Sequence, residues 1–501
     1  MKWSWIASMG LAVCAAVGVQ LASRQPLEIP VDTPTDEVFA LFSEELTKAS
    51  RRAGVVGAAV GITADGQDFL ATYGFQDEDR QQAVTEATPF RVGSISKPFT
   101  AYGVLRMAQQ GQLELHQPAE DFLQQWQFPD SSFDTGNVTI DRLLRHTAGT
   151  NIAGYSGYPA LDRTAQRPFR DPITPPQNLA EQSRTNYPVT LIAEPGERRI
   201  YSGGGYSVLQ MLIEDVNGQS FSDTLDELMF RPLDLQETWF GEERIADRSA
   251  AFNARGRAID DYAFLAQAAA GLTTSPRDMT TFLKALNNPE EGLLSSDTYT
   301  AFFAATPQNE NFAMGLTREA SPRGWIYGHG GNSSTWHAKF HVVPESGDGF
   351  FFLTNTTTGA QLDLDLTCAW RGWIIGRPTR DVCADAFALT RNLSLAGSLV
   401  AGVLALVLTH LLIALVQRKR QFTRLPRRAN GNVGVAKIFA AVTLLPVATL
   451  IVGLNHSDFF YYRPGVTFTD EIPLYEASFL FLMIECLVLL VLMRLWTKRA
   501  T

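Results

Sequence analysis

Cysteine is scarce in this sequence, with four in 501 residues, and no Cys-x-x-Cys pair or Cys/His cluster is present. This argues against a zinc site and against a small disulfide-built scaffold, so we expect no metal. Positive charge is also in deficit, because 42 Lys and Arg face 52 Asp and Glu for a net charge of −10. Nucleic-acid binding needs a basic face, so we expect no nucleic-acid partner. No internal repeat is evident, which argues against a solenoid.

The length of the chain suggests two to four domains. Apolar runs near its two ends separate these ends from the middle of the chain. Near the N-terminus, Lys2 precedes an apolar run that ends at Val19, and Ala22 and Ser23 follow. This pattern predicts a signal peptide over residues 1–22. The segment is either cleaved or retained as an anchor, and in both cases the following chain is exported.

Three further apolar runs predict a membrane domain over residues 393–501, and hence a lipid bilayer as partner. Their ranges are 395–416, 438–454 and 477–493, and each is long enough to cross a bilayer. Seven Lys and Arg and no acidic residue lie between the first two runs, which predicts that this loop is on the inner side. Three spans then place the N-terminal part outside, in agreement with the signal peptide.

Charge and cysteine follow the same division. Residues 393–501 carry 11 Lys and Arg against 5 Asp and Glu, a net of +6, which leaves −16 for residues 1–392. Cys14 lies in the signal segment and Cys486 in the third span. Only Cys368 and Cys383 lie in the exported part. Export to an oxidising compartment favours a disulfide between them over two reduced thiols.

After a predicted linker over 23–36, the exported domain spans 37–390. Its pattern predicts a helix over 38–53, a hairpin of strands 55–62 and 69–73, and a helix from about Ile95 to Gln110. Strand signals return at 335–343 and 350–355, and a closing helix is predicted within 358–376. We therefore predict an α+β domain whose sheet uses both ends of the domain sequence, with a largely helical insert between them.

The sharpest chemical signal is Ser94-Ile95-Ser96-Lys97-Pro98. Proline is tolerated only in the first turn of a helix, so Pro98 predicts a helix start near Ser94. Lys97, three residues after Ser94, then lies on the same helix face. A nucleophilic serine needs a base and a group that stabilises the oxyanion. The Ser-x-x-Lys spacing offers the base, and the helix N-terminus favours negative charge.

Longer strings carry a resemblance to a known family. The segment Arg91–Ala101 resembles the nucleophile region of the serine β-lactamase-related hydrolases, which include class C β-lactamases, D-Ala-D-Ala peptidases, D-amino-acid peptidases and esterases. Four more segments resemble this family's motifs, in its order: Leu143–Gly149, Tyr201–Tyr206, Gly271–Asp278 and Tyr327–Gly331. The resemblance implies a β-lactamase/transpeptidase-like α/β (α+β) sandwich, an antiparallel sheet flanked by helices with a mostly helical subdomain.

The resemblance also implies roles for individual residues, with no metal and no cofactor. Ser94 is expected to be the acylated nucleophile, and Lys97 and Tyr201 the base system. His329 takes the place of the family's third-motif Lys or His, and the backbone N–H groups of Ser94 and Asn332 form the oxyanion hole. Four neighbouring residues are expected to line the substrate site: Gly203, Gly330, Gly331 and Ser333.

The sequence departs from the class C β-lactamase pattern at two motifs. Gly203 stands where Tyr-x-Asn has its asparagine, and His329-Gly330-Gly331 replaces Lys-Thr-Gly. The second change removes a fixed charge that could hold a substrate carboxylate. Both changes favour the peptidase and esterase members.

The predicted function is therefore hydrolysis of an amide or peptide bond next to a D-amino acid, through an acyl-enzyme. The plan of signal, hydrolase domain and three spans resembles peptidases that remove an N-acyl-D-amino-acid cap from nonribosomal peptides. A carboxypeptidase, an esterase, a β-lactamase and a non-catalytic recognition module stay open. The predicted location is the inner (cytoplasmic) membrane of a bacterium, with the hydrolase domain on the periplasmic or outer face.

Overall fold

The computed structural model describes most residues between 26 and 387 and two short segments near the C-terminus. The described ranges are 26–124, 126–154, 158–159, 189–242, 244–259, 262–263, 265–308, 310–333, 335–387, 420–422 and 496–498. The chain divides into two compact units, and the larger contains Leu27–Val382. The predicted signal peptide and all three predicted spans lie outside the described residues. Within the described ranges, no helix has both the length and the apolar character needed to cross a membrane.

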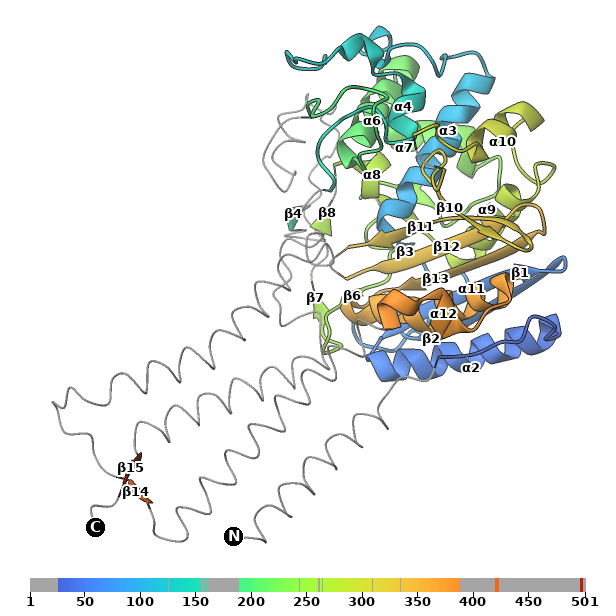
Figure 1. Ribbon diagram of the computed structural model, residues 1–501, viewed down its shortest axis with the longest axis vertical. Coiled ribbons are helices and arrows are strands. Elements are labelled where there is room, and N and C mark those ends of the chain that lie inside the picture. Colours follow the sequence, from blue (N-terminus) through green and yellow to red (C-terminus); the bar gives the residue numbers. More distant parts are fainter. Residues whose placement is uncertain are drawn as a thin grey trace. The chain divides into compact units, whose positions relative to one another are not determined.

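A six-stranded antiparallel sheet lies at the centre of the larger unit (Figure 1), in the order β10-β11-β12-β13-β1-β2. Its strands are β1 (Gly57–Ala64), β2 (Gln67–Gly74), β10 (Thr317–Ser321), β11 (Gly324–Asn332), β12 (His337–Val343) and β13 (Asp348–Thr354). The first strand of the domain pairs with the last, with Val60 opposite Phe352. This confirms the prediction that the sheet uses both ends of the domain sequence. Between β1 and β2, Asp65 and Gly66 both have positive φ, at 50° and 71°, as a two-residue type I′ hairpin turn requires.

One face of the sheet is covered by α2 (Thr35–Ala53), α11 (Cys368–Ile375) and α12 (Thr379–Val382) (Figure 1). In α2, Val38, Phe42 and Leu46 are fully buried at the three- and four-residue spacing of one helix face. They pack in a core with side chains of β1 and β13 and with the tryptophans of α11. The helix begins at Thr35, inside the range predicted as linker, with Asp36 and Glu37 favouring its N-terminus.

The other face carries α3 (Ser96–Gln109), α9 (Pro276–Asn287) and the helical part of the domain (Figure 1). Phe282 of α9 stacks on Phe99 of α3 with ring centres 3.7 Å apart, and also contacts Phe340 of β12. These contacts fix α3 to the sheet. The remaining helices on this side are α4 (Ile140–Leu144), α6 (Gly203–Asn217), α7 (Phe221–Leu225), α8 (Gln267–Ala270) and α10 (Ser296–Phe303).

A small sheet leads directly into the predicted nucleophile. Its strands lie in the order β3 (Phe90–Arg91), β9 (Leu272–Thr274) and β5 (Trp239–Phe240). After β3 comes a 3-10 turn, η1 (Gly93–Ile95), and α3 starts only at Ser96. The α-helix itself therefore starts two residues later than predicted, because the residues before it form a 3-10 turn. Lys97 lies in the first turn of α3, three residues after Ser94, so its side chain is on the same side of the chain as that of Ser94.

The other described strands form two-stranded pairs. Two-stranded pairs are formed by β4 (Tyr158–Pro159) with β8 (Tyr262–Ala263) and by β6 (Ala251–Phe252) with β7 (Ala258–Ile259). In the smaller unit, β14 (Arg420–Phe422) pairs antiparallel with β15 (Trp496–Lys498).

Cys368 and Cys383 are both disulfide-bonded.

Candidate active site

Ser94 lies in the middle of η1, and two glycines allow this turn to lie against the end of β11. Gly93 has a φ of 51°, and a Cβ added there would lie 3.2 Å from the backbone nitrogen of Asn332. A Cβ on Gly331 would clash with the carbonyl oxygen of Val92. Side chains at these positions would push the two segments apart. The close approach places Ser94 beside the last residues of β11.

Ser96 holds the same turn through two hydrogen bonds. Its buried hydroxyl donates to the carbonyl of Gly93 over 2.6 Å and accepts from the backbone N–H of Leu272 over 2.9 Å. Leu272 in turn accepts from Val92 N. The Ser96 hydroxyl therefore joins η1 to β9, both as a donor and as an acceptor. This holds Ser94, which lies in η1, in a fixed position.

Lys97 is only 1% exposed, and it lies directly beside the predicted nucleophile. Its Nζ is 3.2 Å from Ser94 Oγ and donates to the carbonyl of Ala269, at the end of α8, over 2.8 Å. Burial lowers the pKa of Lys97 to about 7, because a charged amine loses its hydration. A substantial share of Lys97 is then neutral at physiological pH and can accept the Ser94 proton.

Tyr201 approaches Ser94 from the loop before α6. Its hydroxyl donates to Ser94 Oγ over 3.0 Å, and its ring centre lies 4.9 Å from the Nζ of Lys97. Burial raises the pKa of Tyr201 to about 12, so the phenol keeps its proton at physiological pH. The two pKa values give the residues of the predicted base system different roles. Lys97 suits the role of base, and Tyr201 suits that of proton donor to a leaving group.

His329 lies on β11 with its ring centre 6.2 Å from that of Tyr201. Its Nδ1 is 2.6 Å from the carbonyl oxygen of Gly330. A carbonyl can only accept, so Nδ1 carries the ring proton and Nε2 is left as an acceptor. Burial, with Lys97 nearby, lowers the pKa of His329 to about 3. The ring is therefore neutral and does not replace the charge of a third-motif lysine.

Asn332, the second residue predicted for the oxyanion hole, ends β11 next to η1. Its side-chain oxygen lies 2.9 Å from Nδ1 of the buried His337, whose Nε2 donates to the carbonyl of Thr357 over 2.9 Å. The Asn332 side chain is thus turned toward β12, while its backbone nitrogen lies on the side of Gly93. Its part in an oxyanion hole with the Ser94 N–H stays a prediction.

The four predicted substrate-lining residues fall into different places. Gly203 is the buried first residue of α6, and Gly331 provides the close approach described above. Gly330 alternates to the other face of β11, where the nearest atom to an added Cβ is in Lys339. Ser333 N donates to the Trp336 carbonyl over 2.9 Å, and Ser333 Oγ accepts from Trp336 N over 3.2 Å. Ser333 therefore closes the turn between β11 and β12, and its contact with a substrate stays a prediction.

Two residues near the site had no role in the sequence-based prediction. His146, in the segment Leu143–Gly149, accepts at Nδ1 from Ser202 N over 3.1 Å, and its ring centre lies 4.6 Å from that of Tyr201. Its carbonyl also accepts from Ile200 N, so His146 holds both neighbours of Tyr201. Arg199 is the second, with its guanidinium carbon 5.8 Å from the Tyr201 ring centre. The available signal for His146 was its place in the segment Leu143–Gly149, and for Arg199 it was proximity to the tyrosine motif.

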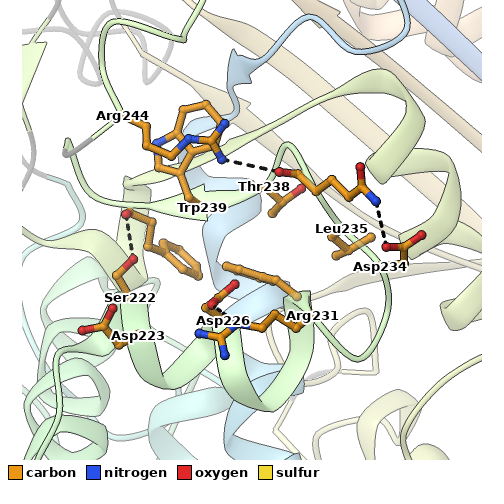
Figure 2. A pocket seen from close by; sticks show the side chains of 12 residues that line it. Ser222, Asp223, Asp226, Arg231, Asp234, Leu235, Thr238, Trp239 and Arg244 are labelled. Atoms are coloured by element: carbon orange, nitrogen blue, oxygen red, sulfur yellow. Dashed lines mark hydrogen bonds and ion pairs between the residues drawn. The ribbon is translucent and has the colours of Figure 1, made fainter.

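A separate cavity of about 550 Å³ lies between α7 and β5 (Figure 2), and none of the catalytic candidates lines it. Arg244 stacks on Trp239 with 4.2 Å between the guanidinium carbon and the ring centre. Arg244 also pairs with Glu237 and Asp247. The charges at this cavity are thus engaged in structural contacts. Within the described ranges, no three His, Cys, Asp or Glu side chains gather as a metal site would require.

Comparisons with known proteins bear on the family and the fold. The family model described as Beta-lactamase matches residues 38–367. Protein flp of Staphylococcus aureus (strain MW2) is 28% identical over 188 residues, which are 37% of this chain and 35% of flp. The alignment thus spans about a third of that relative's length.

Solved structures share the fold. The octameric penicillin-binding protein homologue from Pyrococcus abyssi superposes with a TM-score of 0.53 at 20% identity, covering 68% of this chain and 78% of that one. A crystal structure of SurE with D-Leu gives 0.50 at 23% identity, covering 65% and 72%. The matched range contains every catalytic candidate described above, from Ser94 to Asn332. The chain belongs to the beta-lactamase family.

Proposed function

We propose that this protein is a membrane-anchored, exported serine hydrolase that acts through an acyl-enzyme. Ser94 Oγ attacks the substrate carbonyl as Lys97 takes its proton, and backbone N–H groups stabilise the oxyanion. The bond to the leaving group then breaks while Tyr201 supplies a proton, and water releases the acyl group from Ser94. The observation that carries the proposal is the convergence of a partly neutral amine and a protonated phenol on one hydroxyl, at 3.2 and 3.0 Å.

The proposed substrate is an amide or peptide bond next to a D-amino acid. The family resemblance supports this class, as does the fold shared with SurE, which has been crystallised with D-Leu. The neutral His329 and the side-chain-free Gly203 support a peptidase over a β-lactamase, because neither offers the contacts of the class C motifs. Esterase activity and non-catalytic recognition are the competing outcomes of the tests below.

The proposed location is the inner membrane, with the hydrolase domain outside. The charge pattern around the predicted spans supports it. So does the pairing of β14 with β15, because these segments lie after the first and the third predicted span. Three spans would put both on the same, inner side of a bilayer.

Labelling with a fluorescent fluorophosphonate tests the nucleophile. We expect the wild-type chain to be labelled and Ser94→Ala to lose the label. Ser296→Ala, which removes an exposed hydroxyl at the start of α10, is the matched control and should label like the wild type. Equal labelling of wild type and Ser94→Ala would exclude Ser94 as the nucleophile, and an unlabelled wild type would favour a recognition module.

Paired substrates test the bond and its stereochemistry. We expect an N-acyl-D-alanyl peptide to be cleaved faster than its L-alanyl diastereomer, with both lost in Ser94→Ala. A p-nitrophenyl ester and a chromogenic cephalosporin complete the set. Preference for the ester without D/L discrimination would make the protein an esterase, and preference for the cephalosporin a β-lactamase.

A further inference from the structure

Two unfavourable features meet in His146, which follows α4 in the segment Leu143–Gly149. Its backbone has a φ of 59°, in the left-handed region where a Cβ crowds the following carbonyl. Its ring is buried, and within the described residues its Nε2 has no hydrogen-bond partner. A left-handed backbone and an unpaired buried polar atom both lower the stability of a fold. Local strain of this kind gathers at functional sites, so we looked for what His146 does beside Tyr201.

The hydrogen bonds that His146 accepts come from the two neighbours of Tyr201. Its carbonyl accepts from Ile200 N over 2.8 Å, and its Nδ1 accepts from Ser202 N over 3.1 Å. Between these two bonds, the imidazole lies against the phenol with ring centres 4.6 Å apart. His146 therefore holds the backbone on both sides of Tyr201 and also contacts its ring.

The bond to Ser202 requires a neutral imidazole in one tautomer. A backbone N–H can only donate, so Nδ1 of His146 is unprotonated and Nε2 carries the ring proton. A doubly protonated ring would turn a second donor toward the Ser202 N–H. Burial, with Arg199 and Lys97 nearby, lowers the pKa of His146 well below its usual value. The ring therefore stays neutral at physiological pH, and the bond to Ser202 is kept.

Ser202 has further anchors that do not depend on the His146 side chain. Its Oγ accepts from Thr150 Oγ1 over 2.9 Å and donates to the carbonyl of Asn151 over 2.5 Å. The same side chain caps the N-terminus of α6. The start of α6 should therefore stay in place when the imidazole is removed, and the expected change is confined to Tyr201.

The position of the Tyr201 hydroxyl matters only where the leaving atom needs a proton. In amide cleavage the C–N bond breaks as the Tyr201 proton passes to nitrogen, and the proton that Lys97 took from Ser94 can restore the phenol. A p-nitrophenolate, in contrast, leaves an ester without a proton. We propose that His146 is a positioning residue that holds the Tyr201 hydroxyl for proton transfer to a poor leaving group. This rests on the proposed hydrolase function, and it makes amide cleavage depend on His146.

Two substrates with the same acyl group test this role. They are the p-nitroanilide and the p-nitrophenyl ester of N-acetyl-D-alanine, with kcat/KM measured on the full-length protein. His146→Gly accepts the positive φ and removes the imidazole. We expect kcat/KM to fall about 100-fold for the anilide and less than about threefold for the ester, since only the anilide needs the Tyr201 proton. The ratio of the two values does not depend on the fraction of protein that is folded.

Two asparagine variants are the matched controls. Asparagine also tolerates a positive φ, and its Oδ1 takes the place of Nδ1, so His146→Asn should recover most of the lost anilide activity. His341 on β12 is another buried histidine, and its ring nitrogens have no hydrogen-bond partner in the part of the chain that the structure describes. His341→Asn should leave the ratio of anilide to ester unchanged. An equal loss on both substrates in His146→Gly, no recovery in His146→Asn, or a changed ratio in His341→Asn would contradict the proposal.

Combination with Tyr201→Phe shows whether His146 acts through the phenol. Once the phenol is gone, His146→Gly should cause no further loss of anilide cleavage, although each single variant causes one. Additive losses would overturn the proposal, because His146 would then act by another route. A wild type that is labelled by the fluorophosphonate and cleaves only the ester would also overturn it, since no proton donor is then needed. Failure of the hydrolase proposal is a different result, a wild type that is unlabelled and cleaves neither substrate.

Discussion

Two buried cationic centres, one at Lys97 and the other at Arg91 and Arg248, have opposite surroundings. Lys97 is 1% exposed, and its hydrogen bonds go to neutral oxygens of Ser94 and Ala269. Arg91, which is completely buried, and Arg248, which is 5% exposed, both pair with the carboxylate of Glu242. The Lys97 amine is thus surrounded by neutral dipoles, whereas the two guanidinium groups have a carboxylate as counter-charge.

The difference shows how the chain separates reactivity from support. A carboxylate beside Lys97 would stabilise the ammonium and raise its pKa, and the base would be lost. Arginine stays charged in proteins, so the pair around Glu242 has no proton to exchange. Arg91 lies on β3, three residues before Ser94, and Glu242 lies two residues after β5 ends at Phe240. The fixed ion pairs thus hold the strands from which the nucleophile turn emerges.

Replacing Lys97 gives the largest expected effect. Lys97→Met keeps a similar length and removes the base, so we expect the acylation rate to fall by about 10² to 10⁴-fold. The free energy of unfolding should stay unchanged or rise by about 1–4 kcal/mol, because an apolar group replaces a buried amine. Fluorophosphonate labelling rates and chemical denaturation measure the two quantities. Lower stability together with full labelling would reverse our assignment of the two centres.

Replacing Glu242 should do the converse. Glu242→Gln leaves the buried guanidinium groups of Arg91 and Arg248 without their shared carboxylate, so we expect a loss of about 3–5 kcal/mol in unfolding free energy. Denaturation in urea measures it.

The exposed Arg231–Asp226 pair gives the control for Glu242. Both of its side chains are solvent-accessible, at 66% and 38%, and Asp226→Asn should change stability by less than about 1 kcal/mol. If both variants lose the same stability, burial does not distinguish these ion pairs. If Glu242→Gln slows labelling of the folded protein as much as Lys97→Met does, the support role is wrong.

Local sequence patterns were sufficient for the nucleophile and for much of the sheet. The position of Pro98 and the three-residue spacing bring Ser94 and Lys97 together whatever the rest of the fold does, since both lie on one helical turn. The hairpin around Asp65 and Gly66 is equally local. Pairing of β1 with β13 was predictable because strand signals occur at both ends of the domain.

The rest of the site depends on contacts that no local pattern contains. The carbonyl of Ala269, which holds Lys97 from 172 residues away, is a backbone group and leaves no trace in residue type. Glu242 meets Arg91 across 151 residues. The assignment of Tyr201 came from family resemblance, and the structure adds its distance to Ser94. The neutral state of His329 follows from burial, which the sequence does not display.

The pH dependence of the reaction gives the smallest expected effect and separates the two centres once more. With the pKa of Lys97 near 7, kcat/KM should rise with pH up to about 7, level off above it, and fall about tenfold per unit below it. Glu242→Gln changes the support of the nucleophile turn and leaves Lys97 in place, so this variant should keep the same midpoint. A midpoint above 9 would mean that Lys97 stays charged at neutral pH and that another group is the base.

Stability should follow the same titration with a defined sign. In the unfolded chain Lys97 has a pKa near 10.5, and in the folded chain near 7, so the unfolded state binds more protons between these values. The unfolding free energy contributed by Lys97 therefore rises with pH over this window, by about 1.4 kcal/mol per unit. Measured between pH 7 and 9.5, below the titration of Tyr201, the slope should be present in the wild type and absent in Lys97→Met. Because arginine does not titrate in this range, Arg248→Met should keep the slope even if it lowers overall stability, and this contrast identifies the amine as the group that moves the proton.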